Sequence, residues 1–251
     1  LFKGQVFYAS ARSGKGRNYG WTKEPYLDIY VSDYDAATGG LTDESVLGSK
    51  VNTKFNEGTV SFSPDGTTMY FSGESLDRKA GLFGKKFKKD EEGKSTINIY
   101  SATKVGDEWG NVTTLPFNNE NSNASGPAVS ADGKRLYFSS DMEGTIGKAD
   151  LWYVTLNEGS YGEPVNLGKK INTEGSEMFP YITSKNIMYF ASNGHPGLGM
   201  MDIFASQMNG NDFESESRIY NHGDSSSDNI NDSTDFNGSE SSCGSSCVSG
   251  C

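Results

Sequence analysis

The side chains that most often carry enzymatic chemistry are scarce in this sequence, and their spacing matches no catalytic motif. Of the two histidines, His195 lies in an Asn-Gly-His-Pro-Gly turn and His222 in a Ser/Asn/Asp-rich segment. No Gly-x-Ser-x-Gly elbow presents a serine nucleophile, and there is no calcium loop or phosphate-binding glycine loop. We therefore predict no catalytic, cofactor-binding or metal-binding residues, and we expect the chain not to be an enzyme.

The three cysteines, Cys243, Cys247 and Cys251, all lie at the C-terminal end of the sequence. Their spacing could suggest a metal site, but structural zinc sites use four ligands and no histidine lies close by. We therefore predict no metal. Residues 1–242 contain no cysteine, which is compatible with an exported bacterial protein whose folded part has no disulfide.

Composition and charge narrow the class of protein. The 251 residues carry a net charge of −11 and include 31 glycines, 14 phenylalanines and 13 tyrosines. This mixture suits short strands joined by tight turns. An acidic surface repels phosphate backbones, so we expect no nucleic-acid partner. No apolar run approaches the roughly 18 residues of a membrane helix, which predicts no transmembrane segment.

The secondary structure of this chain is predicted from an internal repeat of strands. One signature consists of an apolar and aromatic strand, and its four copies are Val6-Phe7-Tyr8-Ala9-Ser10, Met69-Tyr70-Phe71-Ser72-Gly73, Leu136-Tyr137-Phe138-Ser139-Ser140 and Met188-Tyr189-Phe190-Ala191-Ser192. A second signature follows each copy as Asp28-Ile29-Tyr30, Asn98-Ile99-Tyr100, Asp150-Leu151-Trp152 and Asp202-Ile203-Phe204. Its copies lie 70, 52 and 52 residues apart. Such regular self-similarity indicates a repeat architecture.

Further elements recur around these strands. The turn Ser63-Pro64-Asp65-Gly66 is repeated as Ser130-Ala131-Asp132-Gly133 and more weakly as Thr183-Ser184-Lys185-Asn186. Pro presets φ in such a turn, while Gly or Asn accepts positive φ. Asn52-Thr53 with Glu57 recurs as Asn172-Thr173 with Glu177. The repeats thus start near residues 6, 63, 130 and 183.

The strand after each turn is apolar on both faces. Met69 and Phe71 point one way while Tyr70 points the other. A strand buried on both faces lies in a sheet that is packed between two others. This is the position of a propeller blade, so we predict an all-β chain, a β-propeller of four-stranded antiparallel blades with about three and a half blades present. We expect the first blade to lack its lead-in turn and the last its final strands, and further blades of the same polypeptide to complete the ring.

These residues resemble the Pro-Asp, WD40-like repeat of TolB-type propellers. The match rests on residues 63–72, 130–152 and 189–204 and covers roughly residues 5–213. The last copy is most similar to propellers of OmpA-family outer-membrane proteins of Bacteroidota. The usual Gly-Gly before the second signature is replaced by Lys148-Ala149 and Met200-Met201. The resemblance implies a periplasmic, outer-membrane-associated or cell-surface protein, with peptidoglycan binding only through an OmpA-like domain that is absent here.

The sequence after the repeat changes character. We divide the chain into propeller blades at residues 1–213 and a low-complexity Ser/Asn/Asp/Gly/Cys tail at residues 214–251. Such a composition buries too little apolar surface to order itself. Either a partner orders it, or the recorded sequence is approximate there and the segment continues the fourth blade, which we favour. A tryptic peptide that starts at Ile219 and holds all three cysteines would refute the second interpretation.

An enzymatic rival is a sialidase-like propeller. The turns at residues 63–66 and 130–133 are similar to Asp-box turns, but there the Gly falls one position later and a Trp follows. A sialidase also needs an arginine cluster and a tyrosine nucleophile. The arginines follow no such pattern and are Arg12, Arg17, Arg78, Arg135 and Arg218. We therefore interpret Asp65 and Asp132 as turn formers.

Two functional hypotheses follow. The preferred one is a non-enzymatic protein-binding scaffold, an accessory subunit of a Bacteroidota outer-membrane secretion or assembly complex similar to type IX secretion. Its partner is expected to contact the long insertions at residues 11–26 and 74–96, because repeat proteins place insertions on a binding face. The alternative is a carbohydrate-binding or glycan-active propeller that stacks sugars on exposed Tyr19, Trp21 or Trp109.

Overall fold

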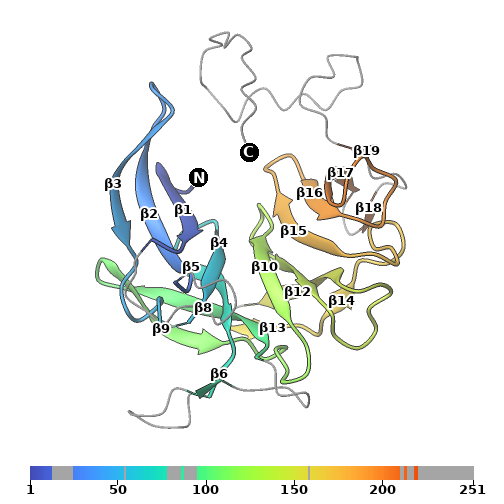
Figure 1. Cartoon of the computed structure of the whole chain (residues 1–251), viewed down its shortest axis with the longest axis horizontal. Coiled ribbons are helices and arrows are strands. Elements are labelled where there is room, and N and C mark those ends of the chain that lie inside the picture. Colours follow the sequence, from blue (N-terminus) through green and yellow to red (C-terminus); the bar gives the residue numbers. More distant parts are fainter. Residues whose placement is uncertain are drawn as a thin grey trace.

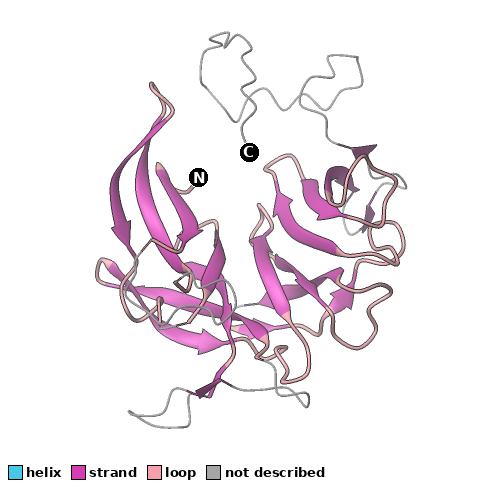
Figure 2. Ribbon diagram, in the orientation of Figure 1, coloured by secondary structure: helices cyan, strands magenta, loops and turns pink. Residues whose placement is uncertain are grey.

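The computed structural model describes residues 1–12, 25–53, 55–77, 86–87, 95–157, 159–209, 212–213 and 218–219. Every regular element in these ranges is a strand (Figure 2). The strands are β1 (Gln5–Ser10), β2 (Asp28–Asp35), β3 (Gly40–Val46), β4 (Glu57–Phe62), β5 (Thr68–Glu74), β6 (Leu76–Asp77), β7 (Lys86–Phe87), β8 (Ile97–Val105), β9 (Glu108–Thr114), β10 (Ala124–Val129), β11 (Arg135–Ser140), β12 (Asp150–Asn157), β13 (Ser160–Tyr161), β14 (Val165–Asn166), β15 (Glu177–Ile182), β16 (Ile187–Ser192), β17 (Asp202–Asn209), β18 (Asp212–Phe213) and β19 (Arg218–Ile219). Within the described part of the chain, no helix could cross a membrane.

Four antiparallel sheets follow one another along the chain as an arc (Figure 1). The first sheet has the order β1-β2-β3 and the second β4-β5-β8-β9. The third is β10-β11-β12 with β13 and β14 both paired to β12, and the fourth is β15-β16-β17 with β18 and β19 both paired to β17. The inner strands β4, β10 and β15 line the concave side of the arc, where β10 contacts both of the others. This arrangement confirms the predicted partial propeller.

The predicted turns form as the sequence indicates. Gly66 and Gly133 have φ of 72° and 71°, and Asn186 has φ of 59°. Each of these residues closes its turn by donating its backbone N–H to the residue three positions earlier, at 2.8–3.0 Å. Asp65 accepts hydrogen bonds from Ser63 Oγ and from the N–H of Thr67. The Asp residues of these turns are therefore turn formers, as predicted.

Three cores lie between successive sheets. Met69 and Phe71 pack toward the first sheet, whereas Tyr70 on the same strand packs toward the third. The third sheet repeats this pattern, with Phe138 in the core facing the second sheet and Tyr137 in the core facing the fourth. All five side chains are buried. Because each middle sheet has two packed neighbours, its second strand must be apolar on both faces.

The fourth sheet is the last one in the described part of the chain, and no described sheet covers its outer face. Ile29, Ile99 and Leu151 hold the same repeat position in the first three sheets, and each is 0% exposed. Ile203 holds that position in the fourth sheet and is 53% exposed. The following sheet packs on Ile29, Ile99 and Leu151. No described segment packs on Ile203 in this way. That further blades complete the ring stays a prediction.

Among the described residues, the sheet that lacks a strand is the first and not the fourth. Among the described strands, none supplies the first sheet with the inner strand that β4, β10 and β15 supply to the others. The expectation that the fourth sheet lacks its final strands is wrong, because the short strands β18 and β19 both pair with β17. β19 lies beyond the proposed boundary at residue 213. Residues 220–251, with the three cysteines, lie outside the described part, so the tail and its boundary stay predictions.

Candidate binding groove

The inner strands share a backbone irregularity that shapes the concave side. Each has a β-bulge opposite the aromatic position of its partner strand, at Thr59 in β4, Gly126 in β10 and Phe179 in β15. All three bulge residues have positive φ, at 31°, 64° and 54°. A bulge re-aims the side chains beside it and leaves backbone groups unpaired. The bulges therefore present side chains and backbone to the inside of the arc.

Two hollows lie along these bulges and together form the candidate groove. The aromatic hollow has a volume of about 410 Å³ and is lined by Phe2, Phe62, Phe179 and Tyr181, among others. The carboxylate hollow has a volume of about 630 Å³, and its walls include Glu57, Glu74 and Phe179. Both hollows are lined by Thr59 and Phe179. The two hollows are therefore adjacent and share a wall at the bulges.

Phe179 is the unusual residue of the groove. It is 53% exposed and has φ of 54°. A bulky residue at positive φ is a backbone outlier that costs on the order of 1–3 kcal/mol. The equivalent residue of the third sheet is Gly126, which carries no such cost. In the fourth sheet, therefore, a residue with a strained backbone lines both hollows with an aromatic side chain.

Two buried carboxyls form one wall of the carboxylate hollow. Glu74 is 6% exposed, and its Oε1 accepts a hydrogen bond from Asn56 Nδ2 at 2.7 Å. Glu57 is 3% exposed and accepts hydrogen bonds from the N–H and hydroxyl of Thr53. Burial raises the pKa of Glu57 to about 8, with the negative charges of Asp28 and Glu74 adding to the effect. Burial also raises the pKa of Glu74.

The same hollow lies where both long insertions join the sheets. Pro25 ends the first insertion, and Glu74 and Ser95 flank the second; all three residues line the carboxylate hollow. The predicted partner contact at residues 11–26 and 74–96 therefore begins at the edge of this hollow. The middles of both insertions, including the lysines at residues 85, 88 and 89, lie outside the described residues apart from the short β6–β7 ribbon.

The repeated Asn-Thr-Glu element holds the sheet edges from which the groove is built. Asn172 Oδ1 accepts a hydrogen bond from Leu151 N at 2.8 Å, and its Nδ2 donates to Leu151 O at 2.9 Å. Asn52 makes the same pair of bonds with Ile29, and Asn118 with Ile99. These asparagines fasten β2, β8 and β12 to the segments that lead into the next sheet.

Other residues singled out in the sequence have structural places. His195 lies in a turn as predicted, where its Nε2 is 2.8 Å from Ile171 O and its ring packs against Phe204. Trp109 was expected to be exposed for sugar stacking, and this expectation is wrong. It is 8% exposed because it packs against Phe62 and lies under Lys104. Tyr19 and Trp21 lie outside the described residues.

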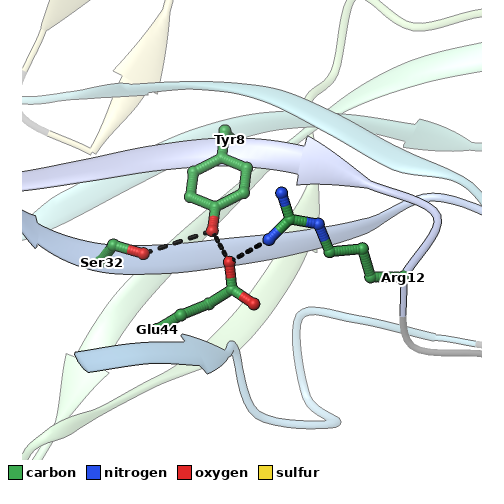
Figure 3. Close-up of polar contacts among 4 residues, drawn as sticks. All are labelled: Tyr8, Arg12, Ser32 and Glu44. Carbon is green, nitrogen blue, oxygen red and sulfur yellow. Dashed lines mark hydrogen bonds and ion pairs between the residues drawn. The ribbon is translucent and has the colours of Figure 1, made fainter. Parts of the chain in front are cut away.

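The open face of the first sheet carries a polar network that the sequence did not indicate (Figure 3). Tyr8 donates a hydrogen bond to Glu44, Arg12 pairs with the same carboxylate, and Ser32 lies 3.2 Å from Tyr8 Oη. The hydrogen bond from Tyr8, supported by the charge of Arg12, lowers the pKa of Glu44. In the second sheet Phe71 takes the place of Tyr8. The two ends of the arc thus differ, one being polar and the other apolar.

No protein-family model and no curated protein matches the chain. Among solved structures it is similar to the putative TolB from Agrobacterium tumefaciens, with a TM-score of 0.51 at 16% identity over 86% of this chain and 62% of that chain. TolB from Acinetobacter baumannii gives 0.48 at 17% identity over 86% of this chain and 40% of that chain. A thermostable family-43 glycoside hydrolase gives 0.47 at 12% identity, covering 78% and 67% of the two chains.

The fold is a partial, TolB-like β-propeller. The likeness to the Agrobacterium protein carries this statement, since its sheets superpose over most of the present chain. The chain spans 40% and 62% of the lengths of the two TolB chains. An identity of 16% establishes the fold alone and transfers no activity. Function must therefore be argued from the groove.

Proposed function

We propose that this chain is a non-enzymatic protein-interaction module whose partner binds along the groove. The observation that carries the proposal is Phe179, an aromatic residue that is 53% exposed and held at positive φ where the two hollows meet. Backbone strain persists where the surrounding structure enforces it, and such strain clusters at functional sites. Exposed aromatics at the centre of a concave surface are also typical anchors of protein interfaces.

A more specific part of the proposal concerns the cellular location of the protein and the complex to which it belongs. The resemblance of the last copy of the repeat, at residues 189–204, to propellers of OmpA-family proteins supports a periplasmic, outer-membrane-associated location. It also supports a role as an accessory subunit of a Bacteroidota secretion or assembly complex. In that setting the groove and the two insertions beside it form one docking surface for another subunit.

Site-specific crosslinking from the groove tests the proposal. A photoreactive phenylalanine analogue is placed at position 179 in the full chain in its native membrane, and at Leu198 as control. Leu198 is 86% exposed, and it is not among the residues that line the two hollows. We expect a protein adduct from position 179, none from position 198, and loss of the adduct when residues 74–96 are deleted.

A second variant and two possible results would separate docking in the groove from its alternatives. Phe179→Asn keeps a residue that tolerates positive φ while removing the ring, so the variant should remain folded and lose partner capture. Equal crosslinking from both positions would refute docking in the groove. Binding or hydrolysis of a glycan by the purified chain, with no protein adduct, would replace the proposal with the carbohydrate alternative.

A further inference from the structure

One residue of the carboxylate hollow has a buried acceptor that the described residues leave without a donor. Glu74 Oε2 is fully buried and has no hydrogen-bond partner among the described residues. A buried polar atom without a partner carries the full cost of its desolvation. Because Glu74 also lines the hollow, a rotation of its carboxyl group would let a group that enters the hollow supply the missing donor.

The two carboxyl groups of the carboxylate hollow favour one kind of hydrogen-bond donor. A carboxylate accepts hydrogen bonds only, whereas lysine and arginine side chains donate only. Neither Glu57 nor Glu74 forms an ion pair with a described residue. Burial raises the pKa of both carboxyls, and the neighbouring Asp28 adds negative charge. A cation placed beside the two carboxyls would offset this desolvation and lower the pKa of both.

The remaining wall suits the stem of a long basic side chain. Leu27, Ile97 and Phe179 line the hollow with apolar surface, and each is at least 39% exposed. Lysine and arginine bury their methylene stems along apolar surface while the charged end seeks a polar partner. The ring of Phe179 also offers a face to a cation. Apolar walls that lead to a buried acceptor match this shape of side chain.

We infer that the carboxylate hollow is a pocket for a lysine or arginine side chain that the partner protein presents, with Glu74 as its principal acceptor. This inference rests on the proposed function and adds a chemical preference to it. It assigns Phe179 and Ile97 to the stem and Glu74 with Glu57 to the charge. The net charge of −11 favours the approach of such a partner.

The probes are blocked tripeptides whose central residue is lysine, arginine, acetyl-lysine or norleucine. Binding to the full chain is followed through the NMR signals of the Ile97 and Leu27 methyl groups. The lysine and arginine peptides should bind about tenfold or more tightly than the norleucine and acetyl-lysine peptides, as a charge-assisted buried hydrogen bond requires. Glu74→Gln should abolish this preference.

The control variant is Glu143→Gln, which removes the same charge from an exposed position outside the hollow. It should keep the preference, and an unchanged methyl spectrum would show that Glu74→Gln is folded. Equal binding of the lysine and norleucine peptides would overturn the inference, and so would a preference that survives Glu74→Gln. If crosslinking from position 179 still captures a protein in that case, the inference alone fails and the proposed function stands.

Discussion

The asparagine that fastens Leu151 offers the sharpest test of how the sheets are joined. Asn172 is 1% exposed and makes hydrogen bonds to Leu151 N, Leu151 O and Asn166 Oδ1. In an antiparallel ladder the N–H and C=O of one residue point to the same side of the strand. Leu167 N also donates to Leu151 O, so in Asn172→Ala the carbonyl keeps a partner while the buried N–H loses its own.

The hydrogen bonds lost in Asn172→Ala determine the expected fall in the free energy of unfolding. A buried N–H without a partner costs about 1–3 kcal/mol, and the other lost hydrogen bonds add roughly 1 kcal/mol. Asn172→Ala should therefore lower the free energy of unfolding by about 2–4 kcal/mol. For a chain of this size the melting temperature should fall by roughly 5–15 °C. Urea unfolding followed by tryptophan fluorescence measures the first quantity, and calorimetry the second.

Two further asparagine variants serve as comparisons for the loss of stability in Asn172→Ala. Asn118 makes the same clamp on Ile99 but is only half-buried, so Asn118→Ala should cost less. Asn157 is exposed at the end of β12, and Asn157→Ala should change stability by no more than about 0.5 kcal/mol. A loss at Asn172 as small as the loss at Asn157 would refute the view that these asparagines hold the sheet edges.

Three other predictions concern charge, burial and backbone. Because burial raises the pKa of Glu57 from 4.5 to about 8, its contribution to stability is full below pH 4.5 and is lost as the pH rises through 8. Glu57→Gln should remove this loss, so between pH 5 and pH 9 its unfolding free energy should gain on the wild type by roughly 3–5 kcal/mol in urea titrations. Leu151→Ala should cost about 2–5 kcal/mol, whereas Ile203→Ala should cost about 1 kcal/mol or less, since Ile203 is 53% exposed; equal losses in thermal melts would show that Ile203 is covered. Gly133→Ala should cost about 1–2 kcal/mol at its positive φ, while Asn186→Gly should stay within about 0.5 kcal/mol; similar melting temperatures would contradict the assigned turn.

The groove illustrates what could not be predicted from the sequence. Pro180 in Met178-Phe179-Pro180-Tyr181, like Pro127 in β10, is a local sign of a bulge. It does not reveal that Phe179 takes a positive φ and is exposed in a groove. Glu74 marked only the edge of an insertion, and Glu57 only a repeated motif. Their shared hollow exists because β4 and β5 pair with the register that places Glu57 opposite Gly73. Burial then changes the chemistry of both carboxyls.

The main strands of each repeat, the turns before them and their order could be predicted from the amino-acid sequence alone. Gly66 and Gly133 occupy turns because backbone sterics act locally, and the alternation of Met69, Tyr70 and Phe71 follows from the period of a strand. Which of the repeated positions are covered became clear only from the packing of the sheets. Ile203 is exposed where Leu151 is buried, and Trp109 is buried where exposure was expected. Coverage depends on segments far away in the chain that pack against a residue, and such contacts leave no local pattern in the sequence.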